Sequence, residues 1–410
     1  MAVACASLLL AAWTSDRPLE GRASGGGARV PSVEAAFRQE SYRPGDRARL
    51  VISDRSRTLY LQVFRSGPER VPTTNDLEMN GVPVTPLKTI RRPPGTQPYA
   101  VPVGRWASGL YFARLDAPDG RVGYAPFVVA PRRLGTYRVA VVLPTLTWQA
   151  YNFRDDDGDG LADTWYAGKR RNTVRLGRPH LDRGVPYGHR FNLGFLQWLH
   201  WTKRRADFLS QWDLEQVESA EDLARAYDLI VFAGHHEYVT TREYDLVEGY
   251  RDLGGNLIFL SSNSFFWRAE REGDVLVKDQ RWRDLGRPEA ALIGVQYKAY
   301  QRSPRGAWRV RATAARSWLF KGTSLRPGST FGRGGVEIDG IVPASPDRIQ
   351  VVAAIPDLFG PGKTAQMTYY ETSSGARVFA PGAFHLARTA TSDPVIWRLL
   401  ENLWARMTRP

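Results

Sequence analysis

The first third of the chain alternates apolar and polar residues in short runs separated by turn signals. The runs ARLVISD (48–54) and TLYLQVFRS (58–66) follow a period of two, which is typical of half-buried strands. Similar runs recur at hairpin intervals, and no helical period competes with them. A Pro-Gly-Asp turn at 44–46 precedes the first run, as is common at the start of a strand. We therefore expect an immunoglobulin-like β-sandwich over residues 32–131.

The rest of the chain shows continuous apolar runs instead of alternating ones. The runs are YRVAVVLP (137–144), DLIVFAG (228–234) and NLIFLSS (256–262), and such strands are buried on both faces. Residues 240–255 have helical spacing between two of these runs and end in a Gly pair, like a helix C-cap. Strands alternating with helices predict a parallel α/β domain over residues 132–410. Ligands of such sheets bind beyond the carboxyl ends of the strands.

Composition and charge narrow the class of protein. A chain of 410 residues with 43% hydrophobic and 24% charged residues is globular and long enough for two domains. The formal net charge is +14, but the basic residues, mostly arginine, are scattered along the chain. Nucleic-acid binding needs a clustered basic surface, so we do not expect nucleic acid as a partner. No apolar stretch in the body of the chain is long enough to span a membrane.

The amino-terminal residues 1–31 differ from the rest. MAVACASLLLAAW is a short apolar segment without the usual basic start, and SDRPLEGRASGGGAR resembles a flexible linker. We expect an export signal and a secreted or cell-envelope protein, with a cytoplasmic tail as the alternative. Cys5 is the single cysteine, which excludes disulfides within the chain and cysteine-rich zinc sites.

An acidic loop, NFRDDDGDGLADTWY (152–166), carries aspartates at alternate positions around a glycine. Alternate carboxylates in a tight loop converge on one hard cation, and the glycine permits the sharp turn. The twelfth position is Tyr166 rather than the bidentate glutamate of an EF-hand. The spacing predicts a short structural calcium loop, with a solvated acidic turn as the alternative. Its expected ligands are Asp155, Asp157, Asp159 and Asp163.

Polar residues gather where the apolar runs end. GHHEY (234–238) follows one run, and because side chains alternate along a strand, His235 and Glu237 are expected on one side and His236 on the other. Asn263 follows the next run and Tyr151 in TWQAYN follows an earlier one. The ends of three parallel strands would therefore form one crevice. Its serines lack the G-x-S-x-G context of a nucleophile elbow, so serine catalysis is not expected.

Several of these segments together resemble a known family. SGLYFARL, TWQAYN, GHHEY, LGGNLIFLSSNSFFWR and ETSSGARVFAPG are similar to the large subunit of N,N-dimethylformamidase, from about residue 32 to the C-terminus. The resemblance implies a β-sandwich followed by an amidotransferase-like, Rossmann-like α/β domain. It also implies a mononuclear ferric iron, held by two tyrosines and one glutamate.

The resemblance assigns the iron ligands by position. The glutamate corresponds to Glu237, one tyrosine to Tyr151, and the second tyrosine to Tyr111, with Tyr124 as the alternative. Phenolates and a carboxylate are hard anionic ligands that suit Fe(III). Because Tyr111 belongs to the first domain, such a site would lie between the two domains.

Catalytic roles follow from the same resemblance. His235 or Glu371 would carry the proton to the leaving amine, and Asn263 would stabilise the oxyanion. The expected function is metal-dependent hydrolysis of an amide or related C–N bond in a small substrate. The alternatives are a non-catalytic exported protein that binds ligands or glycans and has a structural calcium loop, or an α/β domain that catalyses another transfer or hydrolysis. The family's large subunit works with a small helical subunit, and the sequence shows no dedicated segment for docking one. Assembly into a homo-oligomer is a further possibility that the sequence does not decide.

Overall fold

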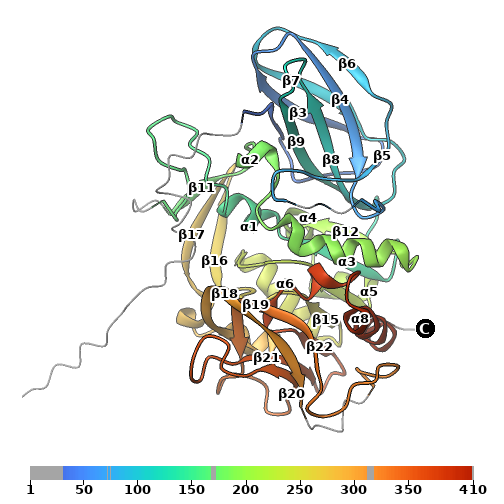
Figure 1. Ribbon diagram of the computed structural model, residues 1–410, viewed down its shortest axis with the longest axis vertical. Helices are drawn as coiled ribbons and strands as arrows, with labels where there is room; N and C mark the ends of the chain where they lie inside the picture. Colours follow the sequence, from blue (N-terminus) through green and yellow to red (C-terminus); the bar gives the residue numbers. More distant parts are fainter. Residues whose placement is uncertain (1–30, 72, 74, 168–171, 312–317, 409–410) are drawn as a thin grey trace, which may run out of the picture.

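The fold is strand-rich and contains several sheets (Figure 1). The computed structural model describes residues 31–71, 73, 75–167, 172–311 and 318–408. The expected export signal and linker therefore lie outside the described residues, except for residue 31. Among the described helices, none is long and apolar enough to cross a membrane.

Two sheets pack face to face in the amino-terminal part, drawn at the top of Figure 1. All strand pairs within them are antiparallel except the pair of β2 with β9. The first sheet has the order β1 (Glu34–Phe37), β3 (Arg47–Asp54) and β7 (Gly95–Pro102). The second has the order β2 (Ser41–Tyr42), β9 (Val122–Val129), β8 (Gly109–Asp116), β4 (Thr58–Arg65) and β5 (Val82–Pro83), with β6 (Lys88–Arg91) also on β4.

The alternating pattern explains how these two sheets meet. Leu50 and Ile52 of β3 and Leu61 and Val63 of β4 are buried in one common core, while the residues between them are exposed or half-buried. A period of two places every second side chain on the same face of a strand. The predicted strands at 48–54 and 58–66 are thus present, and their apolar sides face each other.

A ten-stranded mixed sheet forms the carboxyl-terminal part. Five neighbouring strands are parallel: β12 (Asp207–Ser210), β10 (Val139–Leu143), β13 (Leu229–Phe232), β15 (Asn256–Phe259) and β22 (Arg377–Ala380). The other five extend it with antiparallel pairs: β21 (Ala365–Glu371), β20 (Gln350–Ile355), β18 (Gln296–Val310), β19 (Thr330–Gly340) and β23 (Ala383–Phe384). The continuous apolar runs predicted three of the parallel strands, β10, β13 and β15. Neither β12 and β22 nor the antiparallel extension was predicted from such a run.

Helices cover both faces of the parallel strands. Along β10, Val141 belongs to the core that α3 and α8 complete, and Val142 to the core that α4, α5 and α6 complete. A central strand with both faces covered has no polar face, which accounts for its continuous apolar run. The helices are α3 (His189–Trp201), α4 (Gln211–Glu215), α5 (Ala220–Ala226), α6 (Thr241–Asp252), α7 (Glu289–Ile293) and α8 (Pro394–Met407), with 3-10 turns η1 (Trp282–Leu285) and η3 (Ala387–Thr389).

A small sheet and a short helix lie beside the carboxyl ends of the parallel strands. The sheet has the order β11 (Thr173–Arg175), β17 (Val275–Arg281), β16 (Trp267–Glu272) and β14 (Tyr238–Val239). The TWQAYN segment forms helix α1 (Thr145–Ala150) directly after β10, and a four-residue helical turn, α2 (Leu181–Gly184), follows β11.

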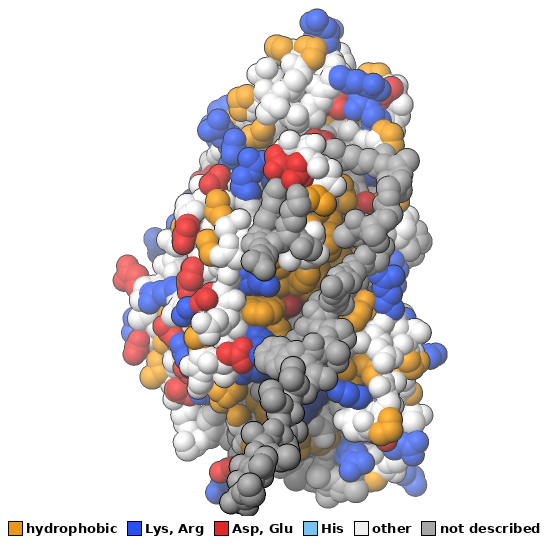
Figure 2. All heavy atoms as spheres, turned by 90° about the vertical axis from the view of Figure 1, so that its left-hand side faces the viewer, with side chains coloured by type: hydrophobic (Ala, Val, Ile, Leu, Met, Phe, Trp, Pro, Cys, Tyr) orange, Lys and Arg blue, Asp and Glu red, His pale blue; other side chains and the backbone are white. Residues whose placement is uncertain are grey.

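Basic side chains on one face of the molecule are scattered among acidic ones (Figure 2).

Candidate active site

Gly234 shapes the strand end that carries the GHHEY segment. It follows β13 with φ at +94°, and a Cβ there would lie 1.8 Å from Oδ1 of Asn192 on α3, so only glycine fits. The turn sends His235 and Glu237 to one side, where His235 Nε2 and Glu237 Oε2 are 3.1 Å apart. His236 packs on the other side, edge-on against the last phenyl ring of β13. The alternation expected for this segment is present.

The carboxylate of Glu237 is the centre of a buried polar cluster. Its exposed fraction is 1%. Tyr151 donates its phenol hydrogen to Oε2 at 2.5 Å, and Tyr166 donates to the two carboxylate oxygens at 3.3 Å each. His235 contacts the same Oε2, and Tyr238 forms a hydrogen bond with the Tyr166 hydroxyl. Two phenols and an imidazole thus contact one carboxylate, and a third phenol contacts one of those two.

Local contacts fix Tyr151, the residue at which α1 ends. Within α1, Thr147 accepts the backbone N–H of Glu237 on its hydroxyl at 3.1 Å, which ties the helix to the GHHEY turn. Just beyond Tyr151, Asn152 donates from Nδ2 to the Pro179 carbonyl at 2.9 Å. The phenol is therefore anchored on both sides in sequence, so its direction toward Glu237 does not depend on its own hydrogen bond alone.

Burial and negative charge keep the phenols of this cluster protonated. Burial first, and the Glu237 carboxylate second, raise the pKa of Tyr151 well above its ordinary value. The same two causes raise the pKa of Tyr166 and of Tyr238. A phenol loses its proton here only when a positive charge offsets both effects. The three tyrosines are therefore neutral and act as hydrogen-bond donors or acceptors.

A second buried carboxylate, Glu337 on β19, faces the same histidine. His235 Nε2 lies 3.9 Å from its Oε2, and Asn263 forms a side-chain hydrogen bond to it. Burial by itself would lower the pKa of His235, but the carboxylates of Glu337 and Glu237 outweigh burial and raise it. Burial raises the pKa of Glu337, and it raises that of neighbouring Asp339 to about 8. One imidazole therefore lies between two carboxylates and holds a proton more firmly than a free histidine.

Sequence reasoning missed two members of this cluster. In the sequence, Tyr166 stands out only as the residue at the twelfth position of the acidic loop. Glu337 lies in the run GGVEIDG, where acids alternate with apolar residues inside a strand that proves to be buried. Acids on the inward face of a strand are rare unless they are paired or functional. That pattern is the signal that could have identified Glu337.

Tyr111 does not join the cluster, contrary to the expectation that it supplies the second phenol. It lies on β8 in the core between the two amino-terminal sheets, where its hydroxyl donates to the Ala107 carbonyl at 2.8 Å. Its ring stacks on Trp106 with the centroids 5.3 Å apart. The alternative, Tyr124, packs edge-on against another ring in a separate small core. Tyr166 occupies the place beside Glu237 that was expected for Tyr111.

Glu371 also lies away from the cluster. It is the last residue of β21, which runs antiparallel to β22, and it pairs in register with Arg377 at the start of that strand. The end of β21 therefore reaches the amino edge of the parallel strands, opposite the edge that carries Glu237. There Glu371 is 38% exposed and lies 3.7 Å from Arg406. The physical reason for the difference is strand direction.

The acidic loop brings three of its four expected calcium ligands together. Asp155, Asp157 and Asp159 offer carboxylate oxygens that all lie within 4.8 Å of one another. Asp163 instead accepts the backbone N–H of Asp156 at 2.6 Å. The loop is exposed at its tip, and calcium binding there stays a prediction.

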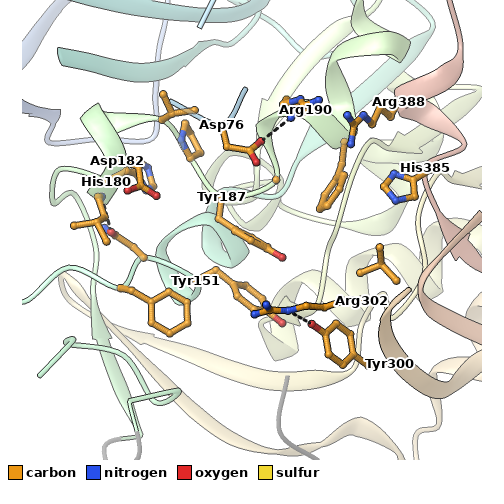
Figure 3. Close-up of a pocket in the computed structure, with 18 of the residues that line it drawn as sticks. Asp76, Tyr151, His180, Asp182, Tyr187, Arg190, Tyr300, Arg302, His385 and Arg388 are labelled. Atoms are coloured by element: carbon orange, nitrogen blue, oxygen red, sulfur yellow. Dashed lines mark hydrogen bonds and ion pairs between the residues drawn. The ribbon is translucent and has the colours of Figure 1, made fainter. Parts of the chain in front are cut away.

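A cavity of about 290 Å³ lies against Tyr151, which links it to the buried carboxylate behind. Figure 3 shows Tyr151 and Tyr187 on one side of the cavity and Arg190, Arg388 and His385 further along it. The rings of Tyr151 and Tyr187 stack with centroids 4.8 Å apart. A concave site with aromatic walls and a few polar groups is typical of small-ligand binding.

Three solved structures with some similarity to the chain all have TM-scores below 0.2. A superoxide reductase (neelaredoxin) from Ignicoccus hospitalis is 11% identical, with a TM-score of 0.18, covering 28% of this chain and 93% of that one. A putative superoxide reductase from Thermotoga maritima is 13% identical, with a TM-score of 0.16, covering 26% and 87%. A cycloisomaltooligosaccharide glucanotransferase from Paenibacillus sp. is 9% identical, with a TM-score of 0.19, covering 56% and 44%. None of these similarities supports a functional assignment.

No curated protein sequence matches the chain. A family profile does: the description N,N-dimethylformamidase beta subunit-like, C-terminal, matches residues 95–390. The matched range contains every member of the cluster around Glu237, and it confirms the resemblance predicted from the sequence. The chain therefore belongs to the N,N-dimethylformamidase beta subunit-like family, to which this C-terminal profile refers.

Proposed function

We propose that the protein is a hydrolase that cleaves the C–N bond of an amide at the Glu237 cluster, defined as Glu237, Tyr151, Tyr166, His235 and Glu337. The observation that carries the proposal is the convergence of a buried carboxylate, two phenols and an imidazole beside a small-molecule cavity. In the reaction, a water oxygen bonds to the carbonyl carbon, the C–N bond breaks, and the amine leaves with a proton while a carboxylic acid forms.

The donor set of the cluster fits the iron that the family implies. Tyr151, Tyr166 and Glu237 bring two phenol oxygens and a carboxylate within hydrogen-bond distance of each other in a buried site. Burial first, and the Glu237 carboxylate second, raise the pKa of both tyrosines, and a bound cation would offset these effects and favour the phenolates. These three residues would hold the ion, and iron bound there would supply the Lewis acidity that polarises an amide carbonyl.

The remaining residues of the cluster bind, orient and carry protons. Tyr151 contacts both the cavity and Glu237, so it couples the position of a substrate to the buried carboxylate. His235 holds a proton at Nε2 between Glu237 and Glu337, from which the leaving amine is protonated. Asn263 orients Glu337 through its side-chain hydrogen bond. Glu337 replaces Glu371 in the role of the second acid.

Finer aspects of the sequence predictions belong to the same proposal. We infer an immunoglobulin-like arrangement for the two amino-terminal sheets, which their face-to-face packing supports. We infer an amidotransferase-like arrangement for the parallel strands and their helices, which the alternation of strands and helices supports. Calcium at Asp155, Asp157 and Asp159 and export of the protein complete the proposal.

Metal analysis and an amide panel test the proposed function. The protein is purified without chelators, its iron content and visible absorption are measured, and amine release is followed on formamides and acetamides. Glu237→Gln is expected to lower kcat/KM by at least about 100-fold and to reduce bound iron. Tyr166→Phe is expected to weaken the visible phenolate-to-iron band. Tyr111→Phe, a buried tyrosine outside the cluster, is the matched control and should change neither.

Two outcomes would contradict the proposal. Full activity in Glu237→Gln would remove the cluster from the chemistry. Absence of hydrolysis across the panel by iron-loaded protein would favour the alternative of a non-catalytic binding protein.

A further inference from the structure

The cavity beside Tyr151 is strongly basic. Arg190 from α3, Arg302 and Arg305 from β18, and Arg388 from η3 line it. Figure 3 shows Arg190 and Arg388 on the side of His385, and Arg302 beside Tyr300. We call these four residues the arginine end. Among the described residues that line the cavity, the acids are Asp76 and Asp182. The arginines therefore exceed the acids in a space of about 290 Å³.

Among the described residues, most of the arginine end has no acidic partner. Arg190 lies 3.5 Å from the carboxylate of Asp76, which is itself 64% exposed. Arg302 donates to a tyrosine hydroxyl at 3.4 Å, and Arg305 donates from Nε to Nε2 of His385 at 2.7 Å. Within the part of the chain that the structure describes, no carboxylate lies within ion-pair distance of Arg302, Arg305 or Arg388. Their positive charge is left to solvent or to a ligand.

The pKa shifts of Arg388 and His385 agree with an excess of positive charge around them. Burial first, then the charges of Arg190 and Arg305, lower the pKa of Arg388, so like charges outweigh the acid nearby. His385 accepts a hydrogen bond from Arg305 and is therefore neutral at that nitrogen. Burial and the surrounding arginines lower its pKa to about 3. A neutral histidine orients Arg305 without adding a cation of its own.

A continuous aromatic wall connects the arginine end with the Glu237 cluster. The rings of Tyr151 and Tyr187 lie 4.8 Å apart, those of Tyr187 and Phe191 lie 6.3 Å apart, and those of Phe191 and His385 lie 5.7 Å apart. Tyr151 contacts Glu237 at one end, and His385 contacts Arg305 at the other. A ligand lying along this wall meets the buried carboxylates with one end and the arginines with the other.

We propose that the substrate is a small amide that also carries a carboxylate, which Arg388, Arg305 and Arg302 bind at the arginine end. This inference rests on the proposed function, because it names the substrate class of the same site. Guanidinium groups bind carboxylates through paired, charge-assisted hydrogen bonds. A monoanion is favoured over a dianionic phosphate because Asp76 and Asp182 line the same cavity and repel a second negative charge.

Matched ligands test the inference. N-formylglycine and N-formyl-4-aminobutyrate are compared with their neutral primary amides by calorimetric titration and by the rate of formate release. The two spacer lengths sample different separations between the amide and the carboxylate. We expect at least one carboxylate to bind about 10-fold or more tightly than its amide, as a charge-assisted pair provides. Raising the salt concentration should weaken binding of that carboxylate and leave the neutral amide unaffected.

Variants assign the effect to the arginine end. Arg388→Met should reduce the preference for the carboxylate to within about 2-fold. Arg305→Met should reduce it less, because Arg305 is exposed and solvent screens its charge, whereas Arg388 is half-buried. The control is Arg309→Met, because Arg309 is exposed on the same strand as Arg305 and does not line the cavity. It should keep the full preference. A thermal melt of each variant confirms that it is folded.

The outcomes separate this inference from the proposed function. The inference is overturned if both carboxylates bind no more tightly than their amides, or if none of the four compounds binds. It is also overturned if Arg388→Met keeps the full preference for the carboxylate. Hydrolysis of neutral amides without any preference overturns it too, while the proposed function stands. A carboxylate preference that depends on Arg388, without hydrolysis of any amide, supports the arginine end and contradicts the proposed function.

Discussion

Arg178 is a buried side chain that holds the segment around Tyr151 in place. It is fully buried, with an exposed fraction of 0%, and pairs with Asp156 at 3.0 Å. Its guanidinium also donates to the carbonyl of Asn152 at 2.9 Å and to that of Gln149 at 3.3 Å. These carbonyls flank Tyr151, at the end of α1. Removing Arg178 is therefore expected to loosen the segment that directs the phenol to Glu237.

The structure sets the size of the effect. Breaking a buried ion pair by removing one partner costs about 3–5 kcal/mol. The cost should fall toward the lower value because Arg154 also pairs with Asp156, at 2.5 Å. The carbonyls of Asn152 and Gln149, which lose their donor, add about 1 kcal/mol each to this loss of stability if water does not replace the guanidinium. We expect Arg178→Met to lower the free energy of unfolding by about 3–5 kcal/mol in total.

The chain offers a matched control for this prediction. Arg175 lies 3.7 Å from the same Asp156 carboxylate, but 56% of its side chain is exposed. Solvent screens such a pair, so Arg175→Met should cost less than about 1 kcal/mol. Urea denaturation of the wild type and both variants measures the two differences, and amide hydrolysis should fall only in Arg178→Met. Equal losses of stability in the two variants would refute the reasoning that burial sets the strength of these contacts.

Other perturbations have equally defined outcomes. Gly234→Ala should lower the free energy of unfolding by at least about 2 kcal/mol and abolish activity, because φ is +94° there and the new Cβ meets Asn192. Circular dichroism melts measure the loss of stability, and amide assays measure the loss of activity. Burial raises the pKa of Glu69 to about 7, so folding disfavours its ionised form. The Glu69→Gln variant should therefore gain stability relative to the wild type as pH rises from about 5 to about 8, by up to about 3 kcal/mol in urea titrations; a constant difference would contradict this. Calcium should raise the melting temperature of the wild type by about 3 °C and leave Asp157→Asn unchanged; equal shifts would exclude Asp157 as a ligand.

Local patterns in the sequence determined the elements and the direction of some side chains. The helical spacing over residues 240–255 became α6, and the apolar run at 256–262 became β15. The alternation in GHHEY placed His235 with Glu237 and turned His236 away. These features follow from the periods of helix and strand, which neighbouring residues fix by themselves.

Tertiary structure alone decided which distant groups meet. Tyr111 and Tyr166 are both tyrosines next to apolar residues, and nothing in their surroundings along the chain shows that only Tyr166 reaches Glu237. Likewise, β19 carries Glu337 to the carboxyl edge of the parallel strands, where Ser262 donates to its carbonyl at 2.8 Å, whereas β21 carries Glu371 to the opposite edge.

The physical reason is a difference in range. Hydrophobic period and turn chemistry act over a few residues, so the sequence determined the alternating strands of the first domain, three parallel strands, α6 and the side of GHHEY that carries chemistry. The direction of each antiparallel strand and the stacking of the sheets depend on contacts between segments that are far apart in the chain. For this reason the second phenol, the second acid and the arginine end could be identified only after the chain was folded.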